Sequence, residues 1–342
     1  MRRYLRPLLI LLLTIGLVAI FLRDADFAGV WKGVQQGRIG LLVLALVTTT
    51  TTYVIRAFRW RYLLAPIGQV RFWSAFEATV IGFSASFLLP ARAGEFLRPW
   101  VLARKEGLSA AAAFATIILE RLFDLIAVLF FLAAFLLLFD TGLATANPAV
   151  FAAVKAGGLA AAGVAVAGLA VFLWLAAHPA ALGWVTGVIE RLLPRRLAAR
   201  LVGLVGLFAR GLAVLRDARR VVATLVWSCP LWVSIATGIW LVARAFAIEV
   251  PFTGAFLLMS ILVVGVAVPT PGSVGGFHEA FRIGANSVYG APNDQAIAAA
   301  IVLHAISFVP VTIAGIVFMA REGLSLRRVR EISARAATEE TA

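Results

Sequence analysis

Long apolar runs alternate with short polar segments along the chain. A helix needs about 20 predominantly apolar residues to cross a bilayer. Runs that meet or approach this length predict six full transmembrane helices, at residues 8–22, 39–55, 111–139, 151–175, 221–246 and 295–319. The pattern therefore predicts an all-α polytopic membrane protein.

Two further apolar segments are too short to span a bilayer comfortably, and both stop at helix breakers. The first, residues 72–89, ends at Pro90, and the second, residues 252–268, runs into PTPGSVGG. Proline and closely spaced glycines interrupt helices. Non-helical backbone at membrane depth is tolerated only where protein or a water-filled cavity surrounds it. We interpret both as broken or re-entrant segments.

Basic residues indicate how the spans are oriented. They are dense in RAFRWRYLL (residues 56–64), in residues 178–220 and in REGLSLRRVR (residues 321–330). Because cytoplasmic loops carry an excess of Lys and Arg, we expect these segments and both termini in the cytoplasm, with the chain in the plasma (cell inner) membrane. Residues 178–220 favour amphipathic helices on the membrane surface; a plain basic connector is the alternative.

This orientation opens the two broken segments to opposite sides of the membrane. Interrupted segments at matching positions in oppositely oriented halves are typical of transporter binding sites. Hydropathy therefore favours an inverted repeat, although the two halves share no visible sequence identity.

Composition narrows the class of protein. Of the 342 residues, 62% are hydrophobic and 14% charged, and the formal net charge is +14. No polar stretch is long enough for a second core, so we expect one membrane domain over residues 1–330 and a short disordered cytoplasmic tail over residues 331–342. The basic charges flank apolar spans, which argues against nucleic-acid binding. A single cysteine excludes an intrachain disulfide and a cysteine metal cluster.

Three charged residues lie inside the third predicted span. Glu120 and Asp124 are four residues apart and share a helix face, with Arg121 at its edge. Charges in a membrane helix are costly and usually paired. Two interpretations stay open: a structural ion pair that locks this helix to its neighbours, or a polar lining of a transport path.

The segments at the two breaks carry further candidates. After Pro90, Arg92 and Arg98 are suited to hold a phosphate through bidentate contacts, and Glu95 to neutralise one of them; an ordinary cytoplasmic loop is the alternative. At the second break a helix restarts, and its free N–H groups favour an anion; ordinary capping is the alternative. The candidates there are Ser273, Gly275, Gly276, His278, Glu279 and Arg282. His304, in the last span, is expected to be a packed, hydrogen-bonded histidine.

No catalytic constellation stands out. The chain has no Walker lysine loop, and His278-Glu279 lacks the second histidine of a zinc helix. We therefore expect no enzyme activity, no metal and no cofactor.

The run LLPARAGEFLRPWVLARKEGLSAAAAFATIILERLFDL resembles the lysylphosphatidylglycerol synthase transmembrane-region family. The later VPTPGSVGGFHEAF, with the helix through residues 295–304, resembles that family's second motif, and the likeness covers about residues 5–325. The resemblance implies a flippase-like domain that moves a phospholipid between leaflets, in a stand-alone member without the aminoacyltransferase domain of larger members. It also makes Glu279 the natural acidic residue of the second motif.

Our leading hypothesis is a flippase or scramblase for an anionic phospholipid or a polyprenyl-linked lipid. Arginines 92, 98, 121 and 282 are the predicted phosphate ligands. The nearby carboxylates and His278 would pair with them or couple to protons. One alternative is a non-transporting accessory subunit of a lipid- or glycan-modifying membrane enzyme, and another is a lipid-modifying enzyme. The expected partners are membrane lipids, a second copy of the chain or a partner membrane enzyme.

Overall fold

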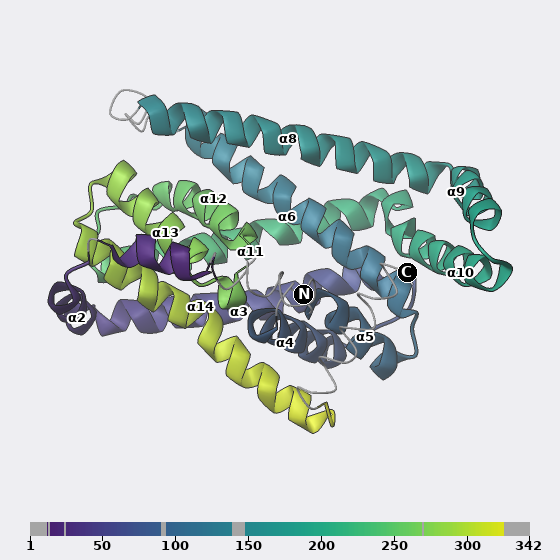
Figure 1. Ribbon diagram of the computed structural model, residues 1–342, viewed down its shortest axis with the longest axis horizontal. Helices are drawn as coiled ribbons and strands as arrows, with labels where there is room; N and C mark the ends of the chain where they lie inside the picture. Colours follow the sequence, from purple (N-terminus) through teal and green to yellow (C-terminus); the bar gives the residue numbers. More distant parts are fainter. Residues whose placement is uncertain are drawn as a thin grey trace.

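A computed structural model describes residues 12, 14–23, 25–89, 94–138, 148–268 and 270–324. Throughout this part the chain is helical, with short connections and no strand (Figure 1). The prediction of an all-α polytopic membrane protein is therefore confirmed. The predicted tail over residues 331–342 and both chain ends lie outside the described residues.

Six helices of the described part are long and apolar enough to cross a membrane. Five of them coincide with predicted spans: α3 (Ile39–Leu64), α6 (Ala110–Leu138), α8 (Pro148–Ala177), α11 (Ala218–Ala245) and α14 (Asn293–Arg321). Much of the predicted span at residues 8–22 lies in a helix, but residues 8–11 and 13 lie outside the described residues. The short helix α2 (Phe27–Gln36) follows it.

The sixth candidate span, Leu197–Arg216, lies where the sequence predicts amphipathic surface helices. This region contains α9 (Pro179–Leu192), α10 (Arg195–Gly211) and the 3-10 helix η2 (Leu212–Arg216). Figure 1 shows α9 and α10 at the end of α8, beside the end of the molecule that holds α5. Length and composition qualify this stretch as a span, so a purely surface position is not the only arrangement that its sequence permits.

Both broken segments form hairpins of two short helices. The first joins α4 (Phe72–Leu88) to α5 (Gly94–Glu106). The second joins α12 (Gly254–Ala267) through η3 (Pro271–Ser273) to α13 (Gly276–Ile283), which continues into a π-helical turn, η4 (Gly284–Val288).

Glycines let the two arms of each hairpin touch. A Cβ on Gly94 would collide with the carbonyl oxygen of Gly82, and a Cβ on Gly276 would lie 2.5 Å from the carbonyl oxygen of Gly265. Gly275, just before α13, has a φ of 87°, which only glycine adopts at little cost.

The order long helix, broken hairpin, long helix occurs twice in the chain. In the first half it is α3, α4, α5 and α6; in the second it is α11, α12, α13 and α14. Figure 1 shows the second set running in the opposite direction to the first. The two halves meet along α3 and α11, which pack antiparallel: Ser234 bonds Thr48 O at 2.8 Å and Arg59 bonds Ser228 at 2.8 Å. The fold therefore has the inverted arrangement that hydropathy favours.

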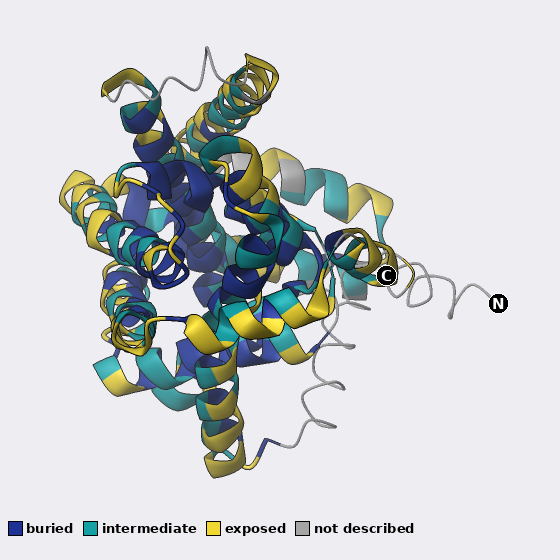
Figure 2. Ribbon diagram, turned by 90° about the vertical axis from the view of Figure 1, so that its left-hand side faces the viewer, coloured by how far each residue is buried: buried dark blue, intermediate teal, exposed yellow. Residues whose placement is uncertain are grey.

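Each half has its own apolar core. One cluster of buried side chains is built mainly from α11 to α14, with the later part of α6, and the other from α3 to α6. Buried residues occupy the middle of the molecule and exposed ones its rim (Figure 2). Many core positions are alanine, which lets membrane helices approach closely. The charged residues discussed next lie where these two cores meet.

Candidate functional site: a buried arginine cluster

Glu120 and Asp124 lie on the buried face of α6. Their residues are 0% and 5% exposed, so both carboxylates point into the protein. The predicted shared face is thus observed, and it looks toward α3, α5 and α11.

Four arginines surround these two carboxylates. Arg59 Nη1 lies 2.6 Å from Asp124 Oδ1, and Arg56 Nη1 lies 3.4 Å from Asp124 Oδ2. Arg98 Nη1 and Arg121 Nη2 lie 3.0 and 3.1 Å from Glu120 Oε1. We call these six residues the arginine cluster; it draws on α3, α5 and α6.

The two arginines from α3 were missed by the sequence reasoning. The basic pattern of their segment, RAFRWRYLL, predicts a membrane interface, and Arg61 in it is exposed. Arg56 and Arg59 are instead buried. The available signal was their spacing of three residues, which places both on one helix face.

Neighbouring polar and aromatic groups fix the cluster in place. Ser228 on α11 accepts a hydrogen bond from Arg59 Nη1 at 2.8 Å, and Trp232 Nε1 donates to Asp124 at 3.2 Å. The Arg98 guanidinium lies 3.9 Å from the centroid of the Trp60 ring. Cation–π contacts of this kind are strongest when desolvated. Trp60 is itself held by a 2.9 Å bond from Nε1 to Thr116.

The cluster carries more positive than negative charge. Four guanidinium groups face two carboxylates among the described residues, which leaves an excess of two positive charges. Glu95, half-buried on α5, lies within electrostatic reach of Arg121 and offsets part of this excess.

Several buried polar atoms of the cluster make no hydrogen bond to any described residue. They are Arg59 Nε and Nη2, Arg98 Nε and Nη2, Arg121 Nε and Glu120 Oε2. Of these, Arg59 Nη2 still lies within ion-pair distance of Glu120 Oε1, at 3.4 Å. Unsatisfied charged donors are costly to bury. Guanidinium groups with free N–H bonds are suited to phosphate, which they can bind in a bidentate manner. The cluster therefore contains buried guanidinium N–H groups that have no hydrogen-bond acceptor among the described residues.

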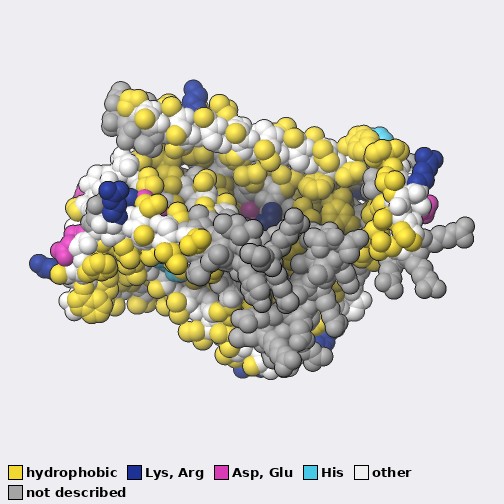
Figure 3. Space-filling model, in the orientation of Figure 1, with side chains coloured by type: hydrophobic (Ala, Val, Ile, Leu, Met, Phe, Trp, Pro, Cys, Tyr) yellow, Lys and Arg dark blue, Asp and Glu magenta, His cyan; other side chains and the backbone are white. Residues whose placement is uncertain are grey.

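The cluster is reached from one side. The Arg121 side chain is 37% exposed, whereas that of Arg98 is 3% exposed. Figure 3 shows charged side chains deep in a hollow beside α8, with apolar side chains between them and α8. A ligand that enters there meets an apolar wall before it meets charge.

The second break brings together a different set of side chains. The His278 and His304 rings stack with centroids 4.5 Å apart. His278 Nδ1 accepts from the Gly275 N–H at 3.4 Å, and His304 Nε2 donates to Gly272 O at 2.8 Å. His304 is thus packed and hydrogen-bonded, as expected from the sequence.

The predicted residues of the second break lie outside the arginine cluster. Arg282 forms a two-point ion pair with Glu279, at 2.6 and 2.8 Å, and bonds Asn293 at 3.1 Å. Ser273 and Gly276 are buried at the break itself. Arg92 lies outside the described residues. The roles assigned to these residues from the sequence stay predictions.

The tips of the two broken hairpins lie near each other. A Cβ on Gly272 would lie 3.9 Å from Phe87 O, at the end of α4. The Phe87 and Phe308 rings are 4.3 Å apart. In the first half, Arg98 of α5 contacts Glu120 of α6, the long helix that follows. In the second half, His278 of α13 contacts His304 of α14, the corresponding long helix. The two halves therefore place polar pairs at corresponding positions.

Among the described residues, no group of three or more His, Cys, Asp or Glu side chains gathers as a metal site.

A family model described as the lysylphosphatidylglycerol synthase TM region matches residues 8–315, nearly the whole chain. No curated protein matches the chain.

Proposed function

The chain belongs to the lysylphosphatidylglycerol synthase TM region family, and we propose that it moves an anionic lipid between the two leaflets of a membrane. The family is membrane-associated and lipid-related. The cargo that we propose is an anionic phospholipid or a polyprenyl-linked lipid, moved by a flippase or scramblase mechanism.

The spare positive charge of the arginine cluster carries this proposal. A purely structural ion-pair network would balance its charges and satisfy its donors. Here the excess of guanidinium groups and the unbonded N–H groups of Arg59, Arg98 and Arg121 offer binding capacity for a phosphate. Glu120 and Asp124 hold the arginines in position.

The inverted architecture supports the same proposal. Transporters of this kind bind their cargo near the membrane midplane, at the interface of two repeats, beside broken helices. The tips of both hairpins lie near each other here, and α3 and α11 form the seam between the halves. Rocking of one half against the other would expose the cluster to each side in turn.

The distribution of basic residues gives the proposed orientation. Exposed arginines and lysines gather around α5, α9, α10 and the start of α11. We assign this basic end to the cytoplasm by the positive-inside rule, with both termini on that side and the chain in the plasma membrane. Arg92 and Glu95 would then meet cargo from the cytoplasm. The break around Gly275, with His278, Glu279 and Arg282, would meet it from the other side.

Reconstitution in liposomes tests the proposal. Purified protein is expected to move fluorescent phosphatidylglycerol across the bilayer, measured by dithionite quenching of the outer leaflet. Arg121→Gln should slow this movement at least tenfold without unfolding the protein, because Arg121 is the most exposed member of the cluster and both carboxylates keep other partners.

Arg104→Gln is the matched control. Arg104 is exposed on α5 and lies outside the cluster, so its removal changes the net charge equally but should leave movement unchanged. If wild-type protein moves no anionic lipid, with or without a pH gradient, the proposal fails and an accessory role becomes the better explanation. Equal effects of both substitutions would remove the cluster from the mechanism.

A further inference from the structure

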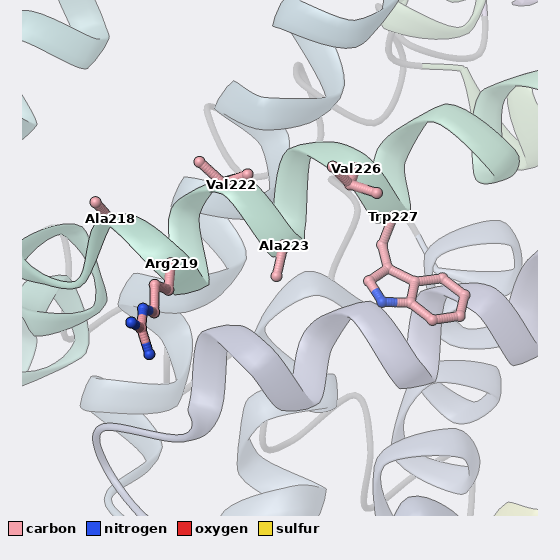
Figure 4. A pocket seen from close by; sticks show the side chains of 6 residues that line it. All are labelled: Ala218, Arg219, Val222, Ala223, Val226 and Trp227. Carbon is pink, nitrogen blue, oxygen red and sulfur yellow. The ribbon is translucent and has the colours of Figure 1, made fainter.

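A groove opens on the outer face of the molecule where α3, the loop after it and α11 meet. Its volume is about 780 Å³, and its lining includes Phe58, Arg61, Tyr62, Gln69, Arg71 and Trp227. A shallower depression of about 480 Å³ shares Trp227 and extends along α11 past Val226 and Val222 to Arg219. In Figure 4, Arg219 and Trp227 both point from α11 toward the neighbouring helix α3. The two depressions form one continuous surface, which we call the groove. Its apolar part consists of Val222, Val226, Phe58 and Trp227, and its polar mouth contains Arg61, Arg71 and Arg219.

The apolar part of the groove is exposed on the outer surface of the protein. Val222 and Val226 are 57% and 61% exposed. Phe58 and Trp227 stack beside them, with ring centroids 6.1 Å apart. At the depth of membrane-spanning helices such a surface is covered by hydrocarbon, and an acyl chain fits along it.

Arginines line the mouth at the basic end of the molecule. Arg61 Nε donates to Val70 O at 2.9 Å, which holds its side chain beside Arg71. Arg71 pairs with Glu106 at 3.1 Å. The exposed Arg219 makes no ion pair with any described residue. Arginine and tryptophan at this depth are typical of the membrane interface, where lipid phosphates lie.

We propose that this groove binds one anionic phospholipid from the leaflet at the basic end. Its phosphate lies between Arg61 and Arg219, and an acyl chain runs over Val222, Val226 and Trp227. Three arginines against one carboxylate give the mouth a net positive charge, which favours an anionic over a zwitterionic headgroup.

This lipid is separate from the cargo of the arginine cluster. Phe58 and Trp227 face the groove, whereas the residues next to them, Arg59 and Ser228, are fully buried and bond each other at 2.8 Å. The helix pair thus has the groove on one side and the cluster on the other. The proposal does not depend on lipid translocation.

Lipid retention measured by native mass spectrometry tests the site. The full chain is released from nanodiscs that contain phosphatidylglycerol and phosphatidylcholine. The double variant Arg61→Gln/Arg219→Gln is expected to weaken phosphatidylglycerol retention by roughly 10- to 30-fold, since each arginine near an anionic lipid contributes about fivefold. The control Arg104→Gln/Arg321→Gln makes the same charge change at exposed positions outside the groove and should retain the lipid as the wild type does.

Quenching of tryptophan fluorescence gives a second readout on the unaltered groove. Phosphatidylglycerol with brominated acyl chains, added to phosphatidylcholine nanodiscs, should quench part of the emission in a saturable way. Trp227→Phe should remove that part. The proposal is overturned if phosphatidylcholine is retained equally well, if the control pair weakens retention as strongly, or if quenching shows no saturable part that depends on Trp227.

Discussion

The cluster residues are buried charges, so their stability depends on the ion pairs that they form. Asp124 lies between Arg56 and Arg59 and also accepts from Trp232. Taking ions out of water costs several kcal/mol each, which their mutual attraction repays only with good geometry. Asp124 therefore both stabilises the fold and positions the arginines around it.

Asp124→Asn is expected to lower the free energy of unfolding by about 3–5 kcal/mol, because it removes the nearer counter-ion of the buried Arg56 and Arg59. Their other carboxylate, Glu120, lies farther away, at 3.7 and 3.4 Å. Thermal unfolding of the purified protein in detergent measures the loss. The double variant Arg59→Gln/Asp124→Asn removes a charge of each sign and should lose less than the single variant. An unchanged unfolding temperature in Asp124→Asn would mean that the ion pair with Arg59 is dispensable.

At the scale of elements, the breaks and their glycines shape the site. Leu89-Pro90 and the glycines around Gly275 predict both interruptions from local chemistry alone. The sequence does not predict the close contact of the hairpin arms, because that contact depends on which glycines face each other across a hairpin. Gly82 and Gly94 are twelve positions apart, and only the fold places them in contact.

Gly94→Ala is expected to separate α4 from α5, because the added methyl group would collide with the Gly82 backbone. Forcing apart packed backbone should cost about 1–3 kcal/mol and displace Arg98, four residues further along α5. Unfolding and lipid-movement assays measure the two effects. Gly157→Ala is the matched control on α8, where a Cβ would meet nothing within 4 Å; it should be neutral or stabilise slightly. Equal behaviour of the two variants would contradict the close contact.

Across the whole molecule, the two halves are joined at both the seam and the basic end. Lys105 of α5 bonds Glu77 of α4 and, at 2.6 Å, Glu322 just after α14. One side chain thus links the first broken hairpin to the last long helix. Partial burial lowers the pKa of Lys105, but its hydrogen bonds to Glu322 and Glu77 outweigh burial and raise the pKa above its ordinary value. A raised lysine pKa means that the link is present at neutral pH and is lost only as the pH rises through that value.

Lys105→Met is expected to change stability by less than about 1 kcal/mol, since partly exposed ion pairs contribute little. It should instead loosen the basic end. The reactivity of Leu324→Cys, a buried position two residues beyond Glu322, toward a water-soluble maleimide measures the opening. That assay needs the exposed Cys229 replaced by serine first. Arg71→Met, which breaks the ion pair with Glu106 on the same side of the molecule, serves as control and should leave the labelling rate unchanged. No rise in labelling for Lys105→Met would show that this contact does not hold the halves together.

The sequence by itself determined the class of protein, five of the long spans, both breaks and the carboxylates of α6. These follow from local properties: apolar length, helix breakers and the four-residue period of a helix face. The hydropathy pattern also predicted that the two halves have opposite orientations.

Only the tertiary structure decided which charges meet. The sequence pattern predicts that Arg56 and Arg59 lie at the membrane interface. In the structure they lie beside Glu120 and Asp124, which are more than sixty positions away in the sequence. By contrast, Arg282 pairs with Glu279 three residues earlier on the same helix, a contact that the helix period alone allows. The reason is physical: apolar periodicity fixes which face of a helix is buried, whereas the partner across that face depends on how helices pack. The excess of positive charge in the cluster is a property of that packing and of no single segment.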